Sequence, residues 1–145
     1  MVILGSDHAG FKYKQKILEY LQKQGVAVKD VGPMVYNAQD SYVDYATKAC
    51  EEYVLREDKD NAKIILICGS GVGMALCANK TKGIRAVNAI YKKQAVLARL
   101  HNNANCLCLG ARLTGIIKTK QIIKAFLNTE FLGGKHEERV KAIEK

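Results

Sequence analysis

The sequence predicts an α/β fold: a parallel sheet of about five strands between two layers of helices, in the three-layer Rossmann-like or flavodoxin-like arrangement. Short apolar runs such as Ile64–Cys68 alternate with longer segments of helical periodicity. These runs are short and apolar instead of alternating with polar residues, which is typical of parallel strands covered on both faces. The chain of 145 residues is long enough for one core and short for two. We therefore expect a single domain over residues 1–145.

Each element follows from its local pattern. Val2–Ser6 is an apolar run that ends in the loop SDHAG. Phe11–Gln24 places apolar residues on one side and lysines on the other, and Gly25 closes this amphipathic helix. The remaining expected strands are Val26–Val31, Ile64–Cys68, Ile84–Asn88 and Cys106–Leu109, and the remaining expected helices are Tyr42–Arg56, Met74–Lys80, Tyr91–Leu100, Thr114–Asn128 and Lys135–Glu144. Residues 32–41 are expected to be irregular.

Composition narrows the classes of function. The net charge is +9, but the lysines are spread over the expected helices instead of clustering with aromatic residues. This pattern indicates a general attraction for small anions, phosphates included, and no nucleic-acid partner. The apolar runs are too short to span a bilayer, and the N-terminus lacks the pattern of a signal peptide. We expect a cytoplasmic protein that does not bind membranes.

Polar residues collect near the ends of the expected strands. In a parallel sheet, ligands bind beyond the carboxyl ends of the strands. We assign four segments to that edge: SDHAG after the first strand, CGSGVG after the third, HNNAN before the fifth and GAR after it. They contain Cys68, His8 and His101, whereas His136 lies in a charged terminal helix and is expected to be exposed. A single histidine more often has a structural role, but two with a thiol favour an acid–base site.

The glycine loop after the third strand does not match either nucleotide motif. Gly69 and Gly71 fit the dinucleotide fingerprint, but Met74 stands at the position of its last glycine. No lysine follows Gly73, as a P-loop requires. The loop predicts close backbone N–H groups at the start of a helix, where they favour negative charge. A plain tight turn is the alternative.

Cys68 directly precedes this loop. A thiol in such a place is readily held as a thiolate, which acts as a base or a nucleophile. The other cysteines lie within apolar patterns and are expected to be buried structural thiols; they are Cys50, Cys77, Cys106 and Cys108. An odd number of cysteines without CxxC spacing indicates reduced thiols. We expect no metal, because the CLC sequence lacks a second ligand pair at metal spacing.

Five motifs, in order and over nearly the whole chain, resemble the ribose-5-phosphate isomerase B family, which includes the galactose-6-phosphate isomerase subunits. They are SDHAGF, ICGSGVGMALCANK, GIRAV, HNNANCLCLGAR and GGKHEERV. The resemblance implies a cofactor-independent isomerase that interconverts ribose 5-phosphate and ribulose 5-phosphate through an enediolate. It also implies a homodimer, or a tetramer, whose active sites use both subunits. The alternatives are a six-carbon substrate (galactose 6-phosphate or allose 6-phosphate) and a non-catalytic anion-binding module.

The resemblance further implies the roles of the site residues. Cys68 is the base that moves the proton between C1 and C2, with Ser70 beside it, and His101 assists opening of the furanose ring. The residues implied in substrate binding are Asp7, His8, Gly69, Gly71, Val72, Gly73, Asn102, Arg112, Lys135 and Arg139. His101, Asn102 and Arg112 are expected to face Cys68 of the partner subunit. Met74 occupies the place of the glutamate base of another branch, which places this chain in the cysteine branch.

Two positions depart from the family pattern. Lys135 stands where an arginine usually precedes Arg139 by four residues, and a lysine offers one compact charge instead of a planar fork. The loop that the family often writes Asp-Tyr-Pro is Ser41-Tyr42-Val43 here, with Asp40 one position earlier. The first departure concerns phosphate binding and the second concerns sugar recognition.

Overall fold

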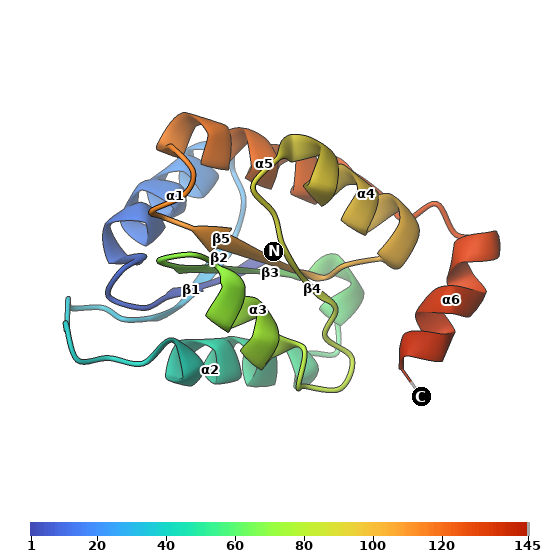
Figure 1. The fold of residues 1–145 in the computed structure, drawn as a ribbon, viewed down its shortest axis with the longest axis horizontal. Helices are drawn as coiled ribbons and strands as arrows, with labels where there is room; N and C mark the ends of the chain where they lie inside the picture. Colours follow the sequence, from blue (N-terminus) through green and yellow to red (C-terminus); the bar gives the residue numbers. More distant parts are fainter. Residues whose placement is uncertain (145) are drawn as a thin grey trace.

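The computed structural model describes residues 1–144 and has the predicted fold class (Figure 1). A five-stranded parallel sheet has the order β2-β1-β3-β5-β4. Its strands are β1 (Val2–Ser6), β2 (Val28–Gly32), β3 (Lys63–Cys68), β4 (Ala86–Asn88) and β5 (Cys106–Gly110). The helices are α1 (Phe11–Lys23), α2 (Tyr42–Val54), α3 (Val72–Ala78), α4 (Lys92–Asn102), α5 (Ile116–Asn128) and α6 (Lys135–Ile143), with a 3₁₀ turn, η1, at Lys59–Asn61.

Two helical layers cover the sheet. In Figure 1, α1, α4 and α5 lie above it, α2 and α3 lie below it, and α6 lies beyond one end. The alternation of side chains along β3 feeds both layers. Ile65 and Ile67 pack with the first layer, and Ile64, Leu66 and Cys68 pack with the second. Both faces are therefore buried, which explains the uninterrupted apolar run, and the Cys68 side chain faces α2 and α3.

The strand order differs from the 2-1-3-4-5 order of flavodoxin-like folds, because β5 pairs with β3 and β4 takes the edge. The residues of β5 are buried and those of β4 are half-exposed, which suits their places. The side chain of Asn79 completes the edge at Ala86. It accepts from the Ala86 N–H at 2.8 Å and donates to the Ala86 carbonyl at 2.9 Å. Both groups are thus satisfied without a further strand.

Several element bounds differ from the prediction. β4 begins at Ala86 rather than Ile84, since the Ile84 N–H donates to Thr81 in a turn and the Arg85 N–H donates to the Asn105 side chain. α3 begins earlier than expected, at Val72. Among the helices of residues 1–144, none combines the length and apolar character that a bilayer span requires.

The carboxyl ends of β1 and β3 flank the topological switch point of the sheet. After β1 the chain continues into α1 on one face, and after β3 it continues into α3 on the other (Figure 1). The loop after β1 crosses directly over the end of β3, since a Cβ at Gly10 would lie 2.2 Å from the Ile67 carbonyl oxygen. Only glycine fits there. This crossing brings the residues that follow β1 next to Cys68.

Candidate active site

A cavity of about 360 Å³ opens at this switch point. Its lining residues are Asp7, His8, Ala9, Tyr42, Cys68, Gly69, Ser70, Gly73, Arg112 and Leu113. They come from the end of β3, from the loops after β1, β3 and β5, and from the starts of α2 and α3. The cavity therefore brings together most of the residues that the sequence placed after the first, third and fifth strands.

The loop after β3 is anchored through its carbonyl groups. The Cys68 carbonyl accepts from the Ala111 N–H at 2.8 Å, and the Gly69 carbonyl accepts from the Arg112 N–H at 3.0 Å. Both donors follow β5, which pairs directly with β3. The loop is thus held by the connection that follows the neighbouring strand, and the Gly71 carbonyl also accepts from the Ala75 N–H of α3 at 3.1 Å.

The Cys68 sulfur accepts a hydrogen bond from this loop. The Gly71 N–H donates to Sγ at 3.0 Å. Gly71 has φ +81°, a left-handed conformation that favours glycine, and a Cβ there would lie 2.9 Å from the Leu109 carbonyl carbon. The Gly71 N–H is thus aimed at the sulfur, where a donor suits the negative charge that a base must carry. Of the backbone N–H groups that the sequence predicted near Cys68, the Gly71 N–H is the one that donates to the sulfur.

The other thiols differ from Cys68 in their surroundings. Burial raises the pKa of Cys50 to about 12 and raises that of Cys106 well above its ordinary value. Cys108 is also buried, and its sulfur lies 3.8 Å from that of Cys106. These three are structural thiols, as predicted. Cys77 is half-buried instead of buried, and its Sγ atom lies 3.8 Å from the hydroxyl of the exposed Thr47.

The ring of His8 is oriented by Asp40 and not by Asp7. Oδ1 of Asp40 accepts from the His8 backbone N–H at 2.9 Å and lies 2.7 Å from Nδ1 of the ring. Asp7 instead accepts from the Gly10 N–H at 2.9 Å and closes the turn that precedes α1. This contact closes a turn and does not cap the helix, because no side chain caps the N-terminus of α1. The cavity-facing imidazole thus depends on a carboxylate from a distant loop.

Tyr42 is a lining residue that was not among the predicted site residues. Its ring lies against the glycine loop, since a Cβ at Gly73 would lie 2.8 Å from the Tyr42 Cζ atom. Tyr42 and Asp40 both belong to the segment that departs from the Asp-Tyr-Pro pattern. This departure was the one feature of the sequence that pointed to the segment, but it did not show that Asp40 contacts His8 or that Tyr42 lines the cavity.

Arg112 belongs to the cavity of its own chain, so the expectation that it faces Cys68 of a partner was wrong. A Cβ at Gly69 would lie 3.3 Å from Nη1 of Arg112. The reason is local: Cys68 pairs with Gly110, the last residue of β5, and Arg112 follows two positions later. The guanidinium and His8 are the groups of this cavity that suit an anion.

His101 and Asn102 lie at the opposite, amino edge of the sheet, and their expected place at the carboxyl edge was wrong. They end α4, and a helix that precedes a parallel strand delivers the chain to the amino end of that strand. His101 stacks on His136, with ring centroids 4.4 Å apart and planes at 10°. His136 is buried, so the expectation of an exposed residue was also wrong.

Lys135 and Arg139 lie beside this stacked pair. They are exposed and one helical turn apart on α6, which packs against the end of α4 (Figure 1). We call His101, His136, Lys135 and Arg139 the amino-edge cluster. Loss of water, together with the positive charges of His101, Lys135 and Arg139, lowers the pKa of His136. None of the four residues lines the cavity around Cys68.

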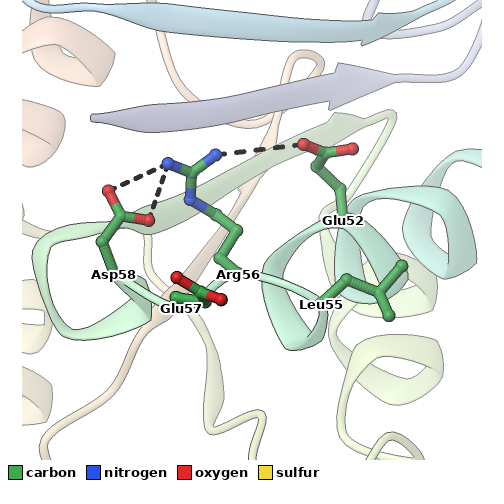
Figure 2. Close-up of a pocket in the computed structure, with 5 residues that line it drawn as sticks. All are labelled: Glu52, Leu55, Arg56, Glu57 and Asp58. Carbon is green, nitrogen blue, oxygen red and sulfur yellow. Dashed lines mark hydrogen bonds and ion pairs between the residues drawn. The ribbon is translucent and has the colours of Figure 1, made fainter.

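A second hollow lies at the end of α2 (Figure 2). Its lining residues are Glu52, Leu55, Arg56, Glu57 and Asp58. The Arg56 guanidinium lies 2.7 Å from an oxygen of Asp58 and 4.0 Å from one of Glu52. Hydrogen bonding between Arg56 and Asp58 raises the pKa of the arginine and lowers that of the carboxyl group. The arginine is thus already paired, and the hollow does not suit an anion.

The cavity at the switch point combines groups of complementary chemistry. A thiol with an N–H donor suits proton transfer, an imidazole held by a carboxylate suits acid–base work, and a guanidinium suits an anionic group. Within residues 1–144, no three His, Cys, Asp or Glu side chains converge where they could hold a metal ion. The fold is that of a doubly wound α/β protein, and its cavity is a candidate acid–base site whose groups suit a small anionic ligand.

Comparison with known proteins names the family. The family model "Ribose/Galactose Isomerase" matches residues 2–143, and the chain belongs to this family of isomerases. Ribose-5-phosphate isomerase B of Escherichia coli is 39% identical over 98% of this chain and 93% of its own length. D-erythrulose-4-phosphate isomerase 2 of Mycolicibacterium smegmatis is 40% identical over 90% of this chain and 85% of its own length. The crystal structure of ribose-5-phosphate isomerase B from Mycoplasma genitalium with bound ribulose-5-phosphate is 38% identical, has a TM-score of 0.93, and is matched over 99% of this chain and 93% of its own. These matches confirm the resemblance of the five motifs.

Proposed function

We propose that this protein interconverts ribose 5-phosphate and ribulose 5-phosphate. The observation that carries the proposal is the Cys68 sulfur, which accepts the Gly71 N–H at 3.0 Å beside a cavity that also holds His8 and Arg112. The similarity to a structure with bound ribulose-5-phosphate supports the choice of substrate. The cavity of about 360 Å³ is at the small end of the range of roughly 300–1,000 Å³ that ligand sites occupy, which suits a five-carbon sugar phosphate.

Proton transfer is the proposed role of Cys68. The thiolate takes the proton from C2 of the open-chain aldose, and the electron pair of that C–H bond forms a double bond between C1 and C2. The π bond of the C1 carbonyl breaks at the same time, and its electron pair moves onto O1 to give an enediolate. The sulfur then returns the proton to C1, while one hydroxyl proton passes from O2 to O1, so the product is an isomer and no oxidant is consumed. The Ser70 hydroxyl oxygen accepts from the Val72 N–H at 3.3 Å, which leaves its own O–H free to donate to a developing oxyanion.

Binding of the phosphate group is the proposed role of the cations. His8 and Arg112 approach the cavity from the chain that carries Cys68. Lys135 and Arg139 lie at the other edge of the sheet, so they reach a phosphate in this cavity only from a second copy. We therefore propose a homodimer with two shared sites, in which the amino-edge cluster and Asn102 of one subunit complete the cavity of the other. His101 then reaches the ring oxygen of the closed sugar and assists its opening.

A four-carbon sugar phosphate is a second candidate substrate, since one relative at 40% identity carries the name D-erythrulose-4-phosphate isomerase. Six-carbon substrates remain the alternative that the sequence suggested. Four-, five- and six-carbon aldose phosphates assayed with the purified protein distinguish these cases. We expect the highest kcat/KM with ribose 5-phosphate. A higher value with another chain length would reassign the substrate, and no turnover of any would support the non-catalytic binding module.

A further inference from the structure

One peptide unit links the Cys68 sulfur to strand β4. The Gly71 N–H of this unit donates to Cys68 Sγ at 3.0 Å, and the Ser70 carbonyl of the same unit accepts from the Asn88 side-chain amide at 3.2 Å. In a planar trans peptide the N–H and C=O groups point in opposite directions. Fixing the carbonyl on Asn88 therefore fixes the direction of the N–H toward sulfur.

We propose that Asn88 is a positioning residue for Cys68. Its amide holds the Ser70–Gly71 peptide in the orientation that presents an N–H, and not a carbonyl oxygen, to the thiolate. This inference rests on the proposed function, because it assigns Asn88 a share in preparing Cys68 as the base. Asn88 itself does not line the cavity and contacts the base only through the peptide.

The peptide needs such a support because a glycine follows it. A glycine adopts positive and negative φ with similar ease, so the unit can rotate about its flanking bonds. In the rotated orientation, the carbonyl oxygen would face the sulfur and repel its negative charge. Backbone contact with β5 supplies part of the restraint, since a Cβ at Gly110 would lie 2.7 Å from the Ser70 oxygen. Asn88 supplies the donor that makes one orientation the stable one.

The side-chain oxygen of Asn88 argues that the residue is not there for stability. Its Oδ1 atom is buried and has no hydrogen-bond partner within residues 1–144. A buried acceptor without a partner destabilises a fold, whereas an apolar side chain of similar volume would not. The identity of the amide atoms follows from the same contact, because Ser70 offers a carbonyl oxygen and only the Nδ2 group donates. The donor is therefore the useful part of this side chain.

The test separates support of the thiol from support of the fold. Asn88→Leu removes both the donor and the unpartnered acceptor, and Asn88→Asp replaces the donor with an anionic acceptor of the same shape. The matched control is Asn79→Ala, which removes the two side-chain hydrogen bonds that the same strand receives at Ala86. The readout is the rate of Cys68 alkylation by iodoacetamide between pH 5 and 9, followed on the Cys68 peptide by mass spectrometry.

We expect Asn88→Leu to keep or raise the melting temperature and to move the alkylation profile to higher pH by about one unit, with a larger shift for Asn88→Asp. We also expect kcat for ribose 5-phosphate to fall about tenfold while KM changes less than about twofold. Asn79→Ala should lower the melting temperature and leave the profile in place. An unchanged profile in both Asn88 variants, or an equal shift in Asn79→Ala, overturns the proposal. The alkylation profile reports on the thiol and does not require turnover. If the Asn88 variants shift the profile but Cys68→Ala keeps its activity, the proposed role of Cys68 as the base is refuted and the positioning role of Asn88 stands.

Discussion

The carboxyl and amino edges of the sheet hold their functional groups in different ways. At the carboxyl edge, backbone groups fix the cavity: Gly71 donates to Cys68 at 3.0 Å, and the Arg112 N–H anchors Gly69 at 3.0 Å. At the amino edge, Lys135 and Arg139 project from an exposed helix, and the ring of His101 is held by stacking on His136. Proton transfer requires fixed geometry, whereas a phosphate tolerates flexible cations. Substitutions of Cys68 and its glycine loop should therefore affect kcat, and substitutions of Lys135 and Arg139 should affect KM.

The largest effect is expected for Cys68→Ala. Loss of the base should lower kcat by about 100- to 10,000-fold and leave the fold intact, because the alanine keeps β3 apolar. The matched control is Cys77→Ala, which removes a half-buried thiol outside the cavity and should leave kcat within about twofold of the wild type. Steady-state kinetics with a thermal melt checks both. A Cys68→Ala variant that retains more than about a tenth of wild-type kcat would contradict the assignment.

Mixing inactive variants tests whether the two edges meet across subunits. Cys68→Ala and His101→Ala should each be nearly inactive, but a heterodimer has one site in which both residues are wild type. After exchange of equal amounts, about a quarter of wild-type activity should return, since half of the dimers are mixed and each has one intact site. Native mass spectrometry confirms the exchange. An inactive mixture with heterodimers present would mean that His101 does not serve the partner's cavity.

Lys135 tests the amino edge at a finer level. If its ammonium group binds the phosphate, Lys135→Ala should raise KM for ribose 5-phosphate severalfold, and Lys135→Arg should hold KM or lower it by up to about tenfold, or roughly 1.4 kcal/mol. Arg139→Ala should raise KM more than Lys135→Ala, and kcat should change little in all three. Measurement at two salt concentrations identifies the charge effect. A KM unchanged from the wild type in both Lys135 variants would show that the Lys135 side chain is solvated and does not bind the phosphate.

The smallest expected effect is a pH dependence of stability. Because the pKa of His136 is lowered in the folded state, the unfolded state binds more protons below about pH 6.5. The neutral His136 side chain therefore contributes fully to the free energy of unfolding above that pH, and this contribution is lost as the pH falls through it. His136→Gln removes the titrating group, so its melting temperature should fall less than that of the wild type between pH 7.5 and 5.5. An equal fall in melting temperature for the two proteins over this pH range would contradict the prediction.

The sequence correctly predicted features that depend on residues adjacent in the chain. The predictions were wrong or missing where the end of a strand, or a contact between residues distant in the chain, decided the outcome. Cys68 and its glycine loop were located correctly, because the strand, the thiol and the turn are consecutive. His101 was assigned to the wrong edge, because proximity to a strand does not say which end of the strand is meant. The contact between His8 and Asp40 joins residues 32 positions apart, and the periodicity of the chain contains no signal for it. The stacking of His101 on His136 likewise needs the packing of α6 on α4.

The alternation along β3 has a consequence for how this chain can change in length. Ile64, Leu66 and Cys68 share one face of the sheet, and Ile65 and Ile67 share the other. Inserting or deleting one residue within β3 would turn the sulfur toward α1 and α5, away from the α2 and α3 layer, because side chains in a strand alternate with a period of two. Removing two residues would restore the face but retract the strand from the cavity. The direction in which the thiol points thus depends on whether the number of residues in β3 changes by one or by two, and the length of β3 constrains the proposed site.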